Sequence, residues 1–371
     1  MKKIGLILST LFYVLFAFAQ PPEVQNGAFK TNTNNAELPL LLADSIQLFD
    51  KNGDIESLKP SAENDQIFFK EVESYKKLKQ QTKSNPNSRS ASSKEEAMLK
   101  RSMQRIESIA TEGETQIEAD VLYYDQGNFD TARAPRLLHA LSLNPNHVQG
   151  LILWAANSIA TGDTAQIKAC FVSLDNLNQF SDEIQCYSKD LVASVPPGFV
   201  LITHGTWDTY GSLNEQFNTH RRDVTTISLD LLQSESYRNL LMKQGFKFPS
   251  QVNINVSYFI EFLKLNVNKH FALSMTIPSE YAEPIERDLV PNGLVFLYPS
   301  TMTDEEVLKN NELYLNSFQY MECGQEHTNE YEFLRENYFP MILTIEALDT
   351  DKSSDKMSTI EAKKIKLRRK N

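Results

Sequence analysis

The stretch that decides the fold is PPGFVLITHGTWDTYGSLNEQFNTHRRDVTTISLDLL, residues 196–232. An apolar run at 199–202 ends in a polar turn at 203–209, and a second β-branched run follows at 224–229. A strand, a polar loop, a short helix and a second strand are typical of a βαβ unit. Ligands of such units usually bind at the loop that leaves the carboxyl end of a strand.

The sequence after this stretch continues the alternation of strands and helices. Residues 271–275 and 293–298 are predicted strands, and the apolar stripe at 256–267 predicts a helix before the first of them. A closing helix, kinked or broken at Pro340, completes the pattern. We therefore expect an α/β domain over 196–348 with a mainly parallel, covered sheet.

A helical region precedes this domain, from residue 94 to 195, and contains an internal repeat. Gly127 and Gly162 begin similar turns 35 positions apart, and an Asn-Pro pair at 144–145 lies between them. This spacing of turn and helix-ending residues is typical of a helix–turn–helix repeat of about 34 residues. The positions that share the pattern are Gly127, Ala132, Ala140, Pro145, Trp154, Ala155 and Gly162. Ile167 stands at a further position of the pattern, where such repeats prefer alanine.

On these positions, residues 113–195 resemble tetratricopeptide repeats. The resemblance implies paired helices that approach closely at small residues, with each pair burying a face on the next. Fewer than about three such units rarely stand alone, so we expect the array to rest on the α/β domain that follows it. The predicted fold class is therefore tetratricopeptide-like helical repeats followed by a mainly parallel α/β sheet domain.

The order of motifs between 198 and 299 carries a second resemblance. It is given by Gly205-Thr206-Trp207-Asp208-Thr209, Arg222-Asp223-Val224, Lys269-His270-Phe271 and Gly293-Leu294 leading to Tyr298-Pro299. This series resembles the soluble domain of bacterial multi-spanning membrane proteins described as glycosyltransferase-like or O-mannosyltransferase-like. That family has two aspartates in the first motif, whereas here only Asp208 remains. The family's membrane part has no counterpart in this chain, so the resemblance implies an accessory domain.

The polar turn supplies the candidate ligand-binding residues, which are His204, Thr206, Trp207, Asp208, Thr209, Tyr210 and, further along, Arg222. A histidine oriented by a carboxylate can act as a general base. In the alternative interpretation, Asp208 and Thr209 cap the following helix, His204 packs at the strand end and Trp207 covers the sheet edge. Arg222 and Asp223 form either an ion pair that fixes the strand start or a substrate clamp.

The sequence has no nucleophile elbow, no phosphate-binding glycine-rich loop and no His-Glu-x-x-His motif. A calcium loop at 50–61 is not expected, because Gly53 stands at the fourth position instead of the sixth. The six histidines show no metal-ligand spacing. We therefore assign no catalytic residue, no metal site and no cofactor from the sequence.

The N-terminus predicts export. Two lysines precede an apolar segment at 4–19 that ends in Ala-Phe-Ala, which is typical of a cleaved signal peptide over 1–19, with an uncleaved anchor as the alternative. Cleavage would remove two of 37 basic residues against 48 acidic ones, so the formal net charge would move from −11 to −13. Such an acidic chain binds nucleic acid poorly. We expect a periplasmic protein.

Three cysteines remain after that cleavage. Cys170 and Cys186 are near each other in sequence and are the better candidates for a disulfide, which would leave Cys323 unpaired. The alternative is three buried small hydrophobic residues. Residues 20–93 are expected to form a leader, a hairpin at Asn52-Gly53 and a polar linker, with a possible helix at 68–81.

The C-terminal segment 349–371 is predicted to be a basic disordered tail, because six of the eight residues at 363–370 are basic. It is either a solvated tail or an electrostatic tether to an anionic membrane surface or an acidic partner. Taken together, the sequence favours a non-catalytic envelope protein that binds a protein partner through helical repeats. The alternative is a glycan-binding or glycan-modifying domain with its site at 204–210.

Overall fold

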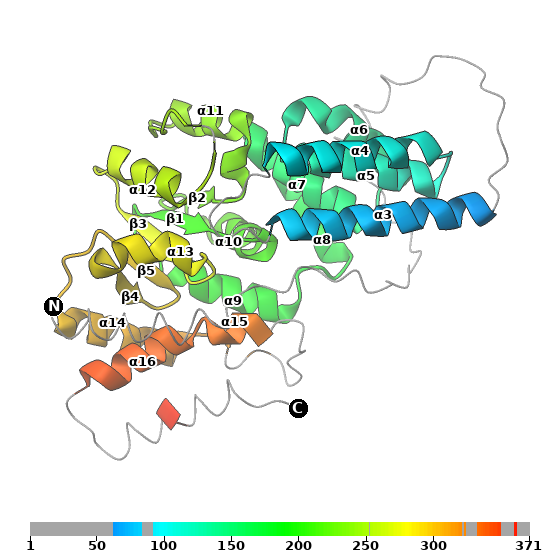
Figure 1. Ribbon diagram of the computed structural model, residues 1–371. Coiled ribbons are helices and arrows are strands. Elements are labelled where there is room, and N and C mark those ends of the chain that lie inside the picture. The colour runs from blue at the N-terminus through cyan, green and yellow to red at the C-terminus, as the bar shows by residue number, and fades with distance from the viewer. Residues whose placement is uncertain are drawn as a thin grey trace. The chain divides into compact units, whose positions relative to one another are not determined.

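The computed structural model describes residues 62–83, 92–251, 253–320, 323, 332–349 and 360–361. They form two compact units. The helical unit contains the described residues up to Gln179 together with Leu231–Asn255, and the sheet unit contains Phe180–Asp230 and the described residues from Val256 onward. The fold is thus mostly helical with one small sheet (Figure 1).

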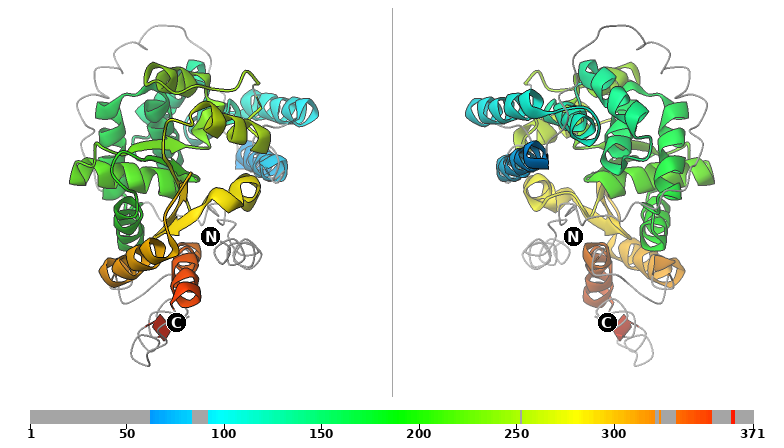
Figure 2. Two further views of the ribbon diagram at one scale, coloured as in Figure 1. Left: turned by 90° about the vertical axis from the view of Figure 1, so that its left-hand side faces the viewer. Right: turned by 90° about the vertical axis from the view of Figure 1, so that its right-hand side faces the viewer.

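The helical unit consists of consecutive helices joined by short turns. Its elements are α3 (Ala62–Lys83), α4 (Ser93–Ile109), α5 (Glu114–Gln126), the 3-10 helix η1 (Thr131–Arg133), α6 (Ala134–Leu143), α7 (Val148–Thr161), α8 (Thr164–Asn176), η2 (Leu231–Gln233) and α11 (Glu235–Lys243). Each helix from α3 to α8 packs on the next one in the chain. The views of Figures 1 and 2 both show α3 and α4 side by side.

Local sequence explains where these helices begin and end. Ser92 forms a capping box with Glu95 at the start of α4, and the Asp163 side chain accepts a hydrogen bond from the Gln166 N–H at the start of α8. Gly162 ends α7 in the left-handed conformation at φ +78°, which glycine adopts at little cost. The predicted helix ends at 144–145 and at Gly162 are confirmed.

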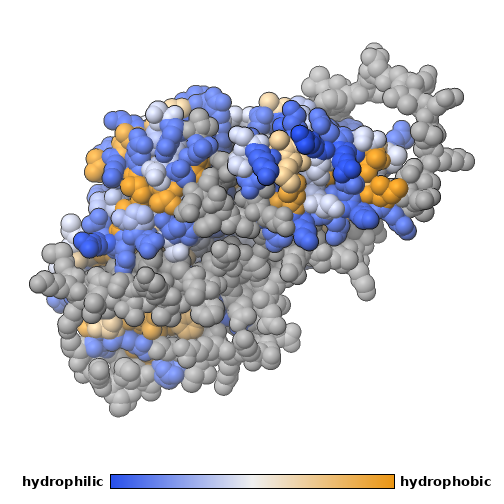
Figure 3. All heavy atoms as spheres, in the orientation of Figure 1, coloured by the Kyte–Doolittle hydropathy of each residue, from blue (hydrophilic) through white to orange (hydrophobic). Residues whose placement is uncertain are grey.

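Two apolar clusters lie among the described residues of the helical unit. The first joins α3, α4 and α5 through residues such as Tyr75, Met103 and Leu122. The second joins α5, α6 and α7 and includes Tyr124 and Leu137. Figure 3 shows that hydrophilic side chains predominate on the visible surface over α3 and α4, with apolar ones between them. These helices therefore pack their apolar faces inward and are amphipathic, as surface helices are.

The sheet unit contains one five-stranded sheet. Its elements are α9 (Asp182–Ala193), β1 (Val200–Thr203), α10 (Thr206–Thr219), β2 (Thr225–Ser228), α12 (Val256–Leu265), β3 (Phe271–Ser274), α13 (Ser279–Ala282), η3 (Glu283–Asp288), β4 (Val290–Asn292), β5 (Val295–Tyr298), α14 (Asp304–Ser317), α15 (Glu332–Glu336) and α16 (Phe339–Leu348). The strand order is β2-β1-β3-β5-β4, so β1 lies inside the sheet. The predicted βαβ unit is confirmed as β1-α10-β2, with Val200 opposite Thr225 in parallel register.

The sheet is mixed, and the expectation of a mainly parallel sheet is wrong. β1 pairs in parallel with β2 and β3, whereas β5 pairs antiparallel with both β3 and β4. The predicted strand at 293–298 begins in fact at Val295, because Gly293, at φ +65°, lies in the turn of a β4–β5 hairpin. The closing helix is broken as predicted, since Pro340 lies in the first turn of α16.

A disulfide joins Cys186 on α9 to Cys323, and Cys170 is a buried free thiol. Both sequence-based expectations, a Cys170–Cys186 pair and three unpaired cysteines, are therefore wrong. Cys170 belongs to α8 of the helical unit, whereas Cys186 belongs to the sheet unit. Sequence proximity was misleading because the paired cysteines are 137 residues apart.

A buried carboxylate reinforces this link one helical turn further along α9. Asp190 accepts hydrogen bonds from the backbone N–H groups of Gln319, at 2.8 Å, and Tyr320, at 2.9 Å, and from the Tyr338 hydroxyl, at 2.9 Å. Burial raises the pKa of Asp190 to about 6, although these hydrogen bonds act in the opposite direction. The segment that follows α14 is therefore fixed to α9 by one covalent bond and by two hydrogen bonds from its N–H groups to the Asp190 carboxylate.

Several sequence-based expectations fall outside the described residues. These are the signal peptide, the leader and the Asn52-Gly53 hairpin, most of the polar linker and nearly all of the basic tail. The predicted helix at 68–81 is confirmed within the longer α3. None of the helices in the described ranges combines the length and apolar character that a membrane crossing requires.

Candidate functional site

The loop predicted to bind a ligand lies where expected, at the carboxyl end of β1. Gly205, at φ +86°, occupies the N-cap position of α10 and permits the sharp turn from strand to helix. β2 and β3 run parallel to β1, so their carboxyl ends lie beside this loop. This is the position at which parallel strands commonly present ligand-binding groups.

Asp208 is the central group of the loop, and it is buried in the first turn of α10. Its Oδ1 accepts a hydrogen bond from the Ser274 hydroxyl at 3.0 Å, and its Oδ2 accepts from the Thr276 hydroxyl at 2.9 Å and the His204 N–H at 3.2 Å. Burial raises the pKa of Asp208 to about 7, against the opposing effect of these hydrogen bonds. Asp208 thus ties α10 to the segment that follows β3.

Asp208 accepts one main-chain N–H at the start of α10, that of His204, whereas no main-chain hydrogen bond to the Thr209 hydroxyl is found among the described residues. Thr209 instead shares a 2.8 Å hydrogen bond with the buried hydroxyl of Thr203 on β1. The Thr209 and Thr203 hydroxyls therefore face each other across the contact between α10 and β1. They hold the helix against the sheet.

His204 is oriented by a main-chain oxygen and by a second carboxylate. Its Nδ1 lies 2.8 Å from the carbonyl oxygen of Thr276, so this nitrogen carries the proton and donates it. Its Nε2 lies 3.8 Å from Oδ1 of Asp230, whose Oδ2 accepts the Gly205 N–H at 2.7 Å. The ring therefore lies between the Thr276 carbonyl oxygen and the Asp230 carboxylate, at the end of β1.

The other loop residues lie beside these two. Thr206 begins α10 and is half-buried, and Tyr210 is buried. The ring of Trp207, also half-buried, meets those of Phe180 and Tyr210 edge to face, with centroid distances of 5.6 and 6.5 Å. The structure therefore brings the loop residues His204 to Tyr210 together.

Arg222 lies apart from them, in the turn that precedes β2 and thus at the amino end of the parallel strands. Its exposed side chain is not the partner of Asp223 that we expected. Arg221 forms that ion pair, at 3.0 Å, and also donates to the carbonyl oxygens of Val192 and Val195. The predicted ion pair at the start of β2 is therefore present, but Arg221 forms it instead of Arg222.

A cavity of about 540 Å³ opens at this amino end of the strands. Its lining combines rings, prolines and polar side chains, and includes Phe199, Arg221, His270, Asn292, Pro299 and Tyr314. The sequence analysis missed this site because its walls come from α9, the start of β1, the turn before β3, the residues after β5, and α14. The available signals were two Pro-containing segments, at 196–197 and 298–299, and the exposed His270.

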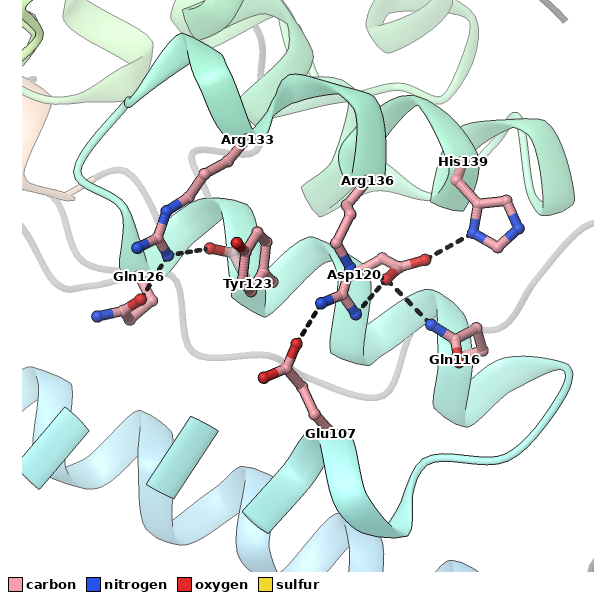
Figure 4. Close-up of polar contacts among 8 residues, drawn as sticks. All are labelled: Glu107, Gln116, Asp120, Tyr123, Gln126, Arg133, Arg136 and His139. Carbon is pink, nitrogen blue, oxygen red and sulfur yellow. Dashed lines mark hydrogen bonds and ion pairs between the residues drawn. The ribbon is translucent and has the colours of Figure 1, made fainter. Parts of the chain in front are cut away.

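The helical unit carries a third group of polar side chains, centred on the buried Asp120 of α5 (Figure 4). Its carboxylate accepts from Arg136 Nε at 2.6 Å and Gln116 Nε2 at 3.0 Å, and lies 2.7 Å from His139 Nδ1. Arg136 also pairs with Glu107 on α4. This network ties three successive helices together.

Two guanidinium groups contact one ring at the edge of this network. The Arg133 and Arg136 guanidinium carbons lie 4.6 and 4.4 Å from the centre of the Tyr123 ring, which fits cation–π contacts. Figure 4 shows the ring between the two arginine side chains. Both arginine side chains retain exposure, 25% for Arg133 and 33% for Arg136. They form the partly exposed surface called here the Arg–Tyr–Arg surface.

Within the described parts of the chain, no group of three or more His, Cys, Asp or Glu residues is placed to hold a metal ion. Comparisons with protein-family models, with curated proteins and with solved structures find no match to this chain.

Proposed function

We propose that this chain is an exported cell-envelope protein whose helical unit binds a partner polypeptide as a non-catalytic interaction module. The observation that carries the proposal is the Arg–Tyr–Arg surface of Tyr123, Arg133 and Arg136. Tyrosine and arginine are enriched among the residues that contribute most to protein–protein binding.

The packing of this surface favours binding because its side chains are already positioned. Arg136 is fixed by Asp120 and Glu107, and Arg133 donates to the Tyr123 carbonyl oxygen at 2.9 Å. Long side chains that are ordered before association lose less conformational entropy when a partner binds. The surface therefore has the pre-organisation expected of a binding site.

The helix arrangement supports a repeat-based module. α5 and α7 begin 34 residues apart, at Glu114 and Val148, and each packs on the helix that follows it. This spacing agrees with the tetratricopeptide-like repeats that we propose within residues 113–195. Repeats of that kind present helix surfaces to partner chains.

Export is supported by the signal-peptide pattern at 1–19 and by the Cys186–Cys323 disulfide. Disulfides form and persist in oxidising compartments such as the periplasm. A disulfide-bonded protein with a helical interaction unit fits a role in the cell envelope.

Site-specific photo-crosslinking tests the proposal in intact cells. A photo-reactive residue at Ala132, which is exposed beside Arg133, should capture one adduct of defined mass. The matched control is the same residue at Val267, which is 74% exposed and belongs to the sheet unit. Adding Tyr123→Ala should abolish the Ala132 adduct. The same adducts from both positions, or none from either, would contradict the proposal.

The alternative, a glycan site at 204–210, has less support. The Asp208 carboxylate already accepts three internal hydrogen bonds and is 4% exposed. Thermal-shift measurements with sugars and sugar phosphates decide between the two functions. A shift in the native protein that Asp208→Ala removes would favour the glycan site over the protein-binding proposal.

A further inference from the structure

We propose that the cavity at the amino end of the parallel strands binds a proline-containing, extended segment of a polypeptide. This site belongs to the sheet unit and is separate from the Arg–Tyr–Arg surface. Its volume of about 540 Å³ is within the range of specific ligand sites. Several lining residues, among them Pro197, His270 and Pro299, are exposed, so the cavity reaches the surface.

The hydrogen-bonding groups of the cavity wall favour a ligand that offers acceptors. Three acceptors of the wall are already engaged. The carbonyl oxygens of Val195 and Pro196 accept from Arg221 and the Phe199 N–H, and Oδ1 of Asn292 accepts from Asn310.

Hydroxyl protons remain for a ligand. The Tyr314 oxygen accepts from Asn292 Nδ2 at 3.3 Å, and the Ser300 oxygen accepts from the Met302 N–H at 3.4 Å. Each of these hydroxyls keeps its own proton, which it can donate. The wall therefore offers two hydroxyl donors to a ligand that carries acceptors.

The charge of the wall argues against an ionic ligand. Arg221 is the one Lys, Arg, Asp or Glu residue among the described residues that line the cavity. Its Nε and Nη2 donate to the Asp223 carboxylate, and its Nη1 and Nη2 donate to two main-chain oxygens. With its charge paired and most of its N–H groups used, Arg221 is poorly placed to clamp an anion.

The aromatic side chains of the cavity wall also favour a proline-containing ligand. Phe199 and His270 stack with their centroids 5.2 Å apart, and Tyr314 supplies a further aromatic surface in the wall. A proline-containing segment in the polyproline II conformation offers apolar rings and carbonyl acceptors, and its prolines lack the N–H donor. Aromatic-lined grooves that bind such segments use this combination. An oligosaccharide would instead bring many hydroxyl donors, whereas three of the wall's acceptors are already engaged.

Fluorescence polarisation with a fluorescein-labelled decaproline peptide tests the inference on the full chain. We expect saturable binding with a dissociation constant below about 1 mM. A glycine–serine peptide of equal length, which has N–H donors and no rings, should bind markedly more weakly.

Two variants locate the site. Tyr314→Phe keeps the ring and removes the hydroxyl donor, so binding should weaken by about five-fold. His270→Ala removes one ring of the stacked pair, and binding should again weaken by about five-fold. The matched control is Val267→Ala, which alters an exposed side chain in the same connection outside the cavity wall and should leave binding unchanged. Thermal unfolding of each variant shows whether it remains folded.

Absence of decaproline binding would overturn the inference, and so would binding that neither Tyr314→Phe nor His270→Ala weakens in a folded protein. Binding of maltoheptaose without binding of decaproline would replace the inference with a glycan site. None of these results depends on crosslinking at Ala132, so the two proposals can fail separately.

Discussion

Breaking the Cys186–Cys323 disulfide should destabilise the sheet unit strongly. The bond joins α9 to the segment that follows α14, across a sequence separation of 137 residues. Closing such a long loop removes many conformations from the unfolded chain. The perturbation is reduction with dithiothreitol or the paired substitution of Cys186 and Cys323 by serine.

The magnitude follows from that separation. The chain-entropy treatment gives about 5 kcal/mol at 25 °C for a loop of this length, and measured disulfides usually contribute about 2–4 kcal/mol. The hydrogen bonds from Gln319 and Tyr320 to Asp190 do not require the disulfide, so the reduced protein keeps part of the link. We expect a loss of about 2–4 kcal/mol in the free energy of unfolding.

Urea unfolding followed by far-UV circular dichroism measures this loss. For a chain of this size, the midpoint should fall by about 1 M urea or somewhat less upon reduction. Dithiothreitol should have no effect on the paired serine variant. Thiol titration in denaturant should find one thiol before reduction, from Cys170, and three afterwards.

An unfolding midpoint that does not change upon reduction would refute the entropic reasoning. Three titratable thiols in protein purified without reductant would refute the disulfide itself. A midpoint shift in the paired serine variant upon addition of dithiothreitol would show that the reductant acts elsewhere.

Three further predictions concern stability. Asp208→Asn should flatten the pH dependence of the free energy of unfolding. The raised pKa of about 7 makes the stabilising contribution of Asp208 complete below about pH 4 and lost as the pH rises through 7. The difference between the free energies of unfolding at pH 5 and pH 8, measured with urea, should therefore be about 2 kcal/mol smaller in the variant. Gly113→Ala should cost roughly 1–2 kcal/mol, because Gly113 has a positive φ. Gly162→Ala should cost more, because Gly162 also has a positive φ and the Leu240 side chain lies against it. Thermal unfolding that ranks the two variants in reverse would contradict this. Asp163→Ala should cost about 1 kcal/mol by removing the α8 cap, and an unchanged urea midpoint would show that the cap contributes nothing.

Local features could be predicted from the sequence because they depend on neighbouring residues. The βαβ unit around Val200, the helix end at Gly162 and the break before Pro340 all follow from short patterns. β4 was missed because its three residues adjoin the Gly293 turn and lack a pattern of their own.

Features that depend on distant residues could not be predicted in this way. The disulfide partner of Cys186 lies 137 residues away, and only the folded chain shows which cysteine that is. The same holds for the cavity, where Phe199, His270 and Tyr314 meet from separate elements. Asp208 was identified as one candidate loop residue, but the hydrogen bond that it accepts from Ser274 depends on the pairing of β1 with β3.

The two units alternate along the sequence, and this constrains how the protein can be synthesised and cut into fragments. The helical unit includes α11, which packs on α7 and places Leu240 against Gly162, although the chain has already supplied β1 and β2 before α11. A ribosome must therefore complete residue 243 before this unit has all its helices, by which time part of the sheet has emerged. No single cut yields both units intact, and a fragment ending at residue 195 would lack α11, which packs on α7.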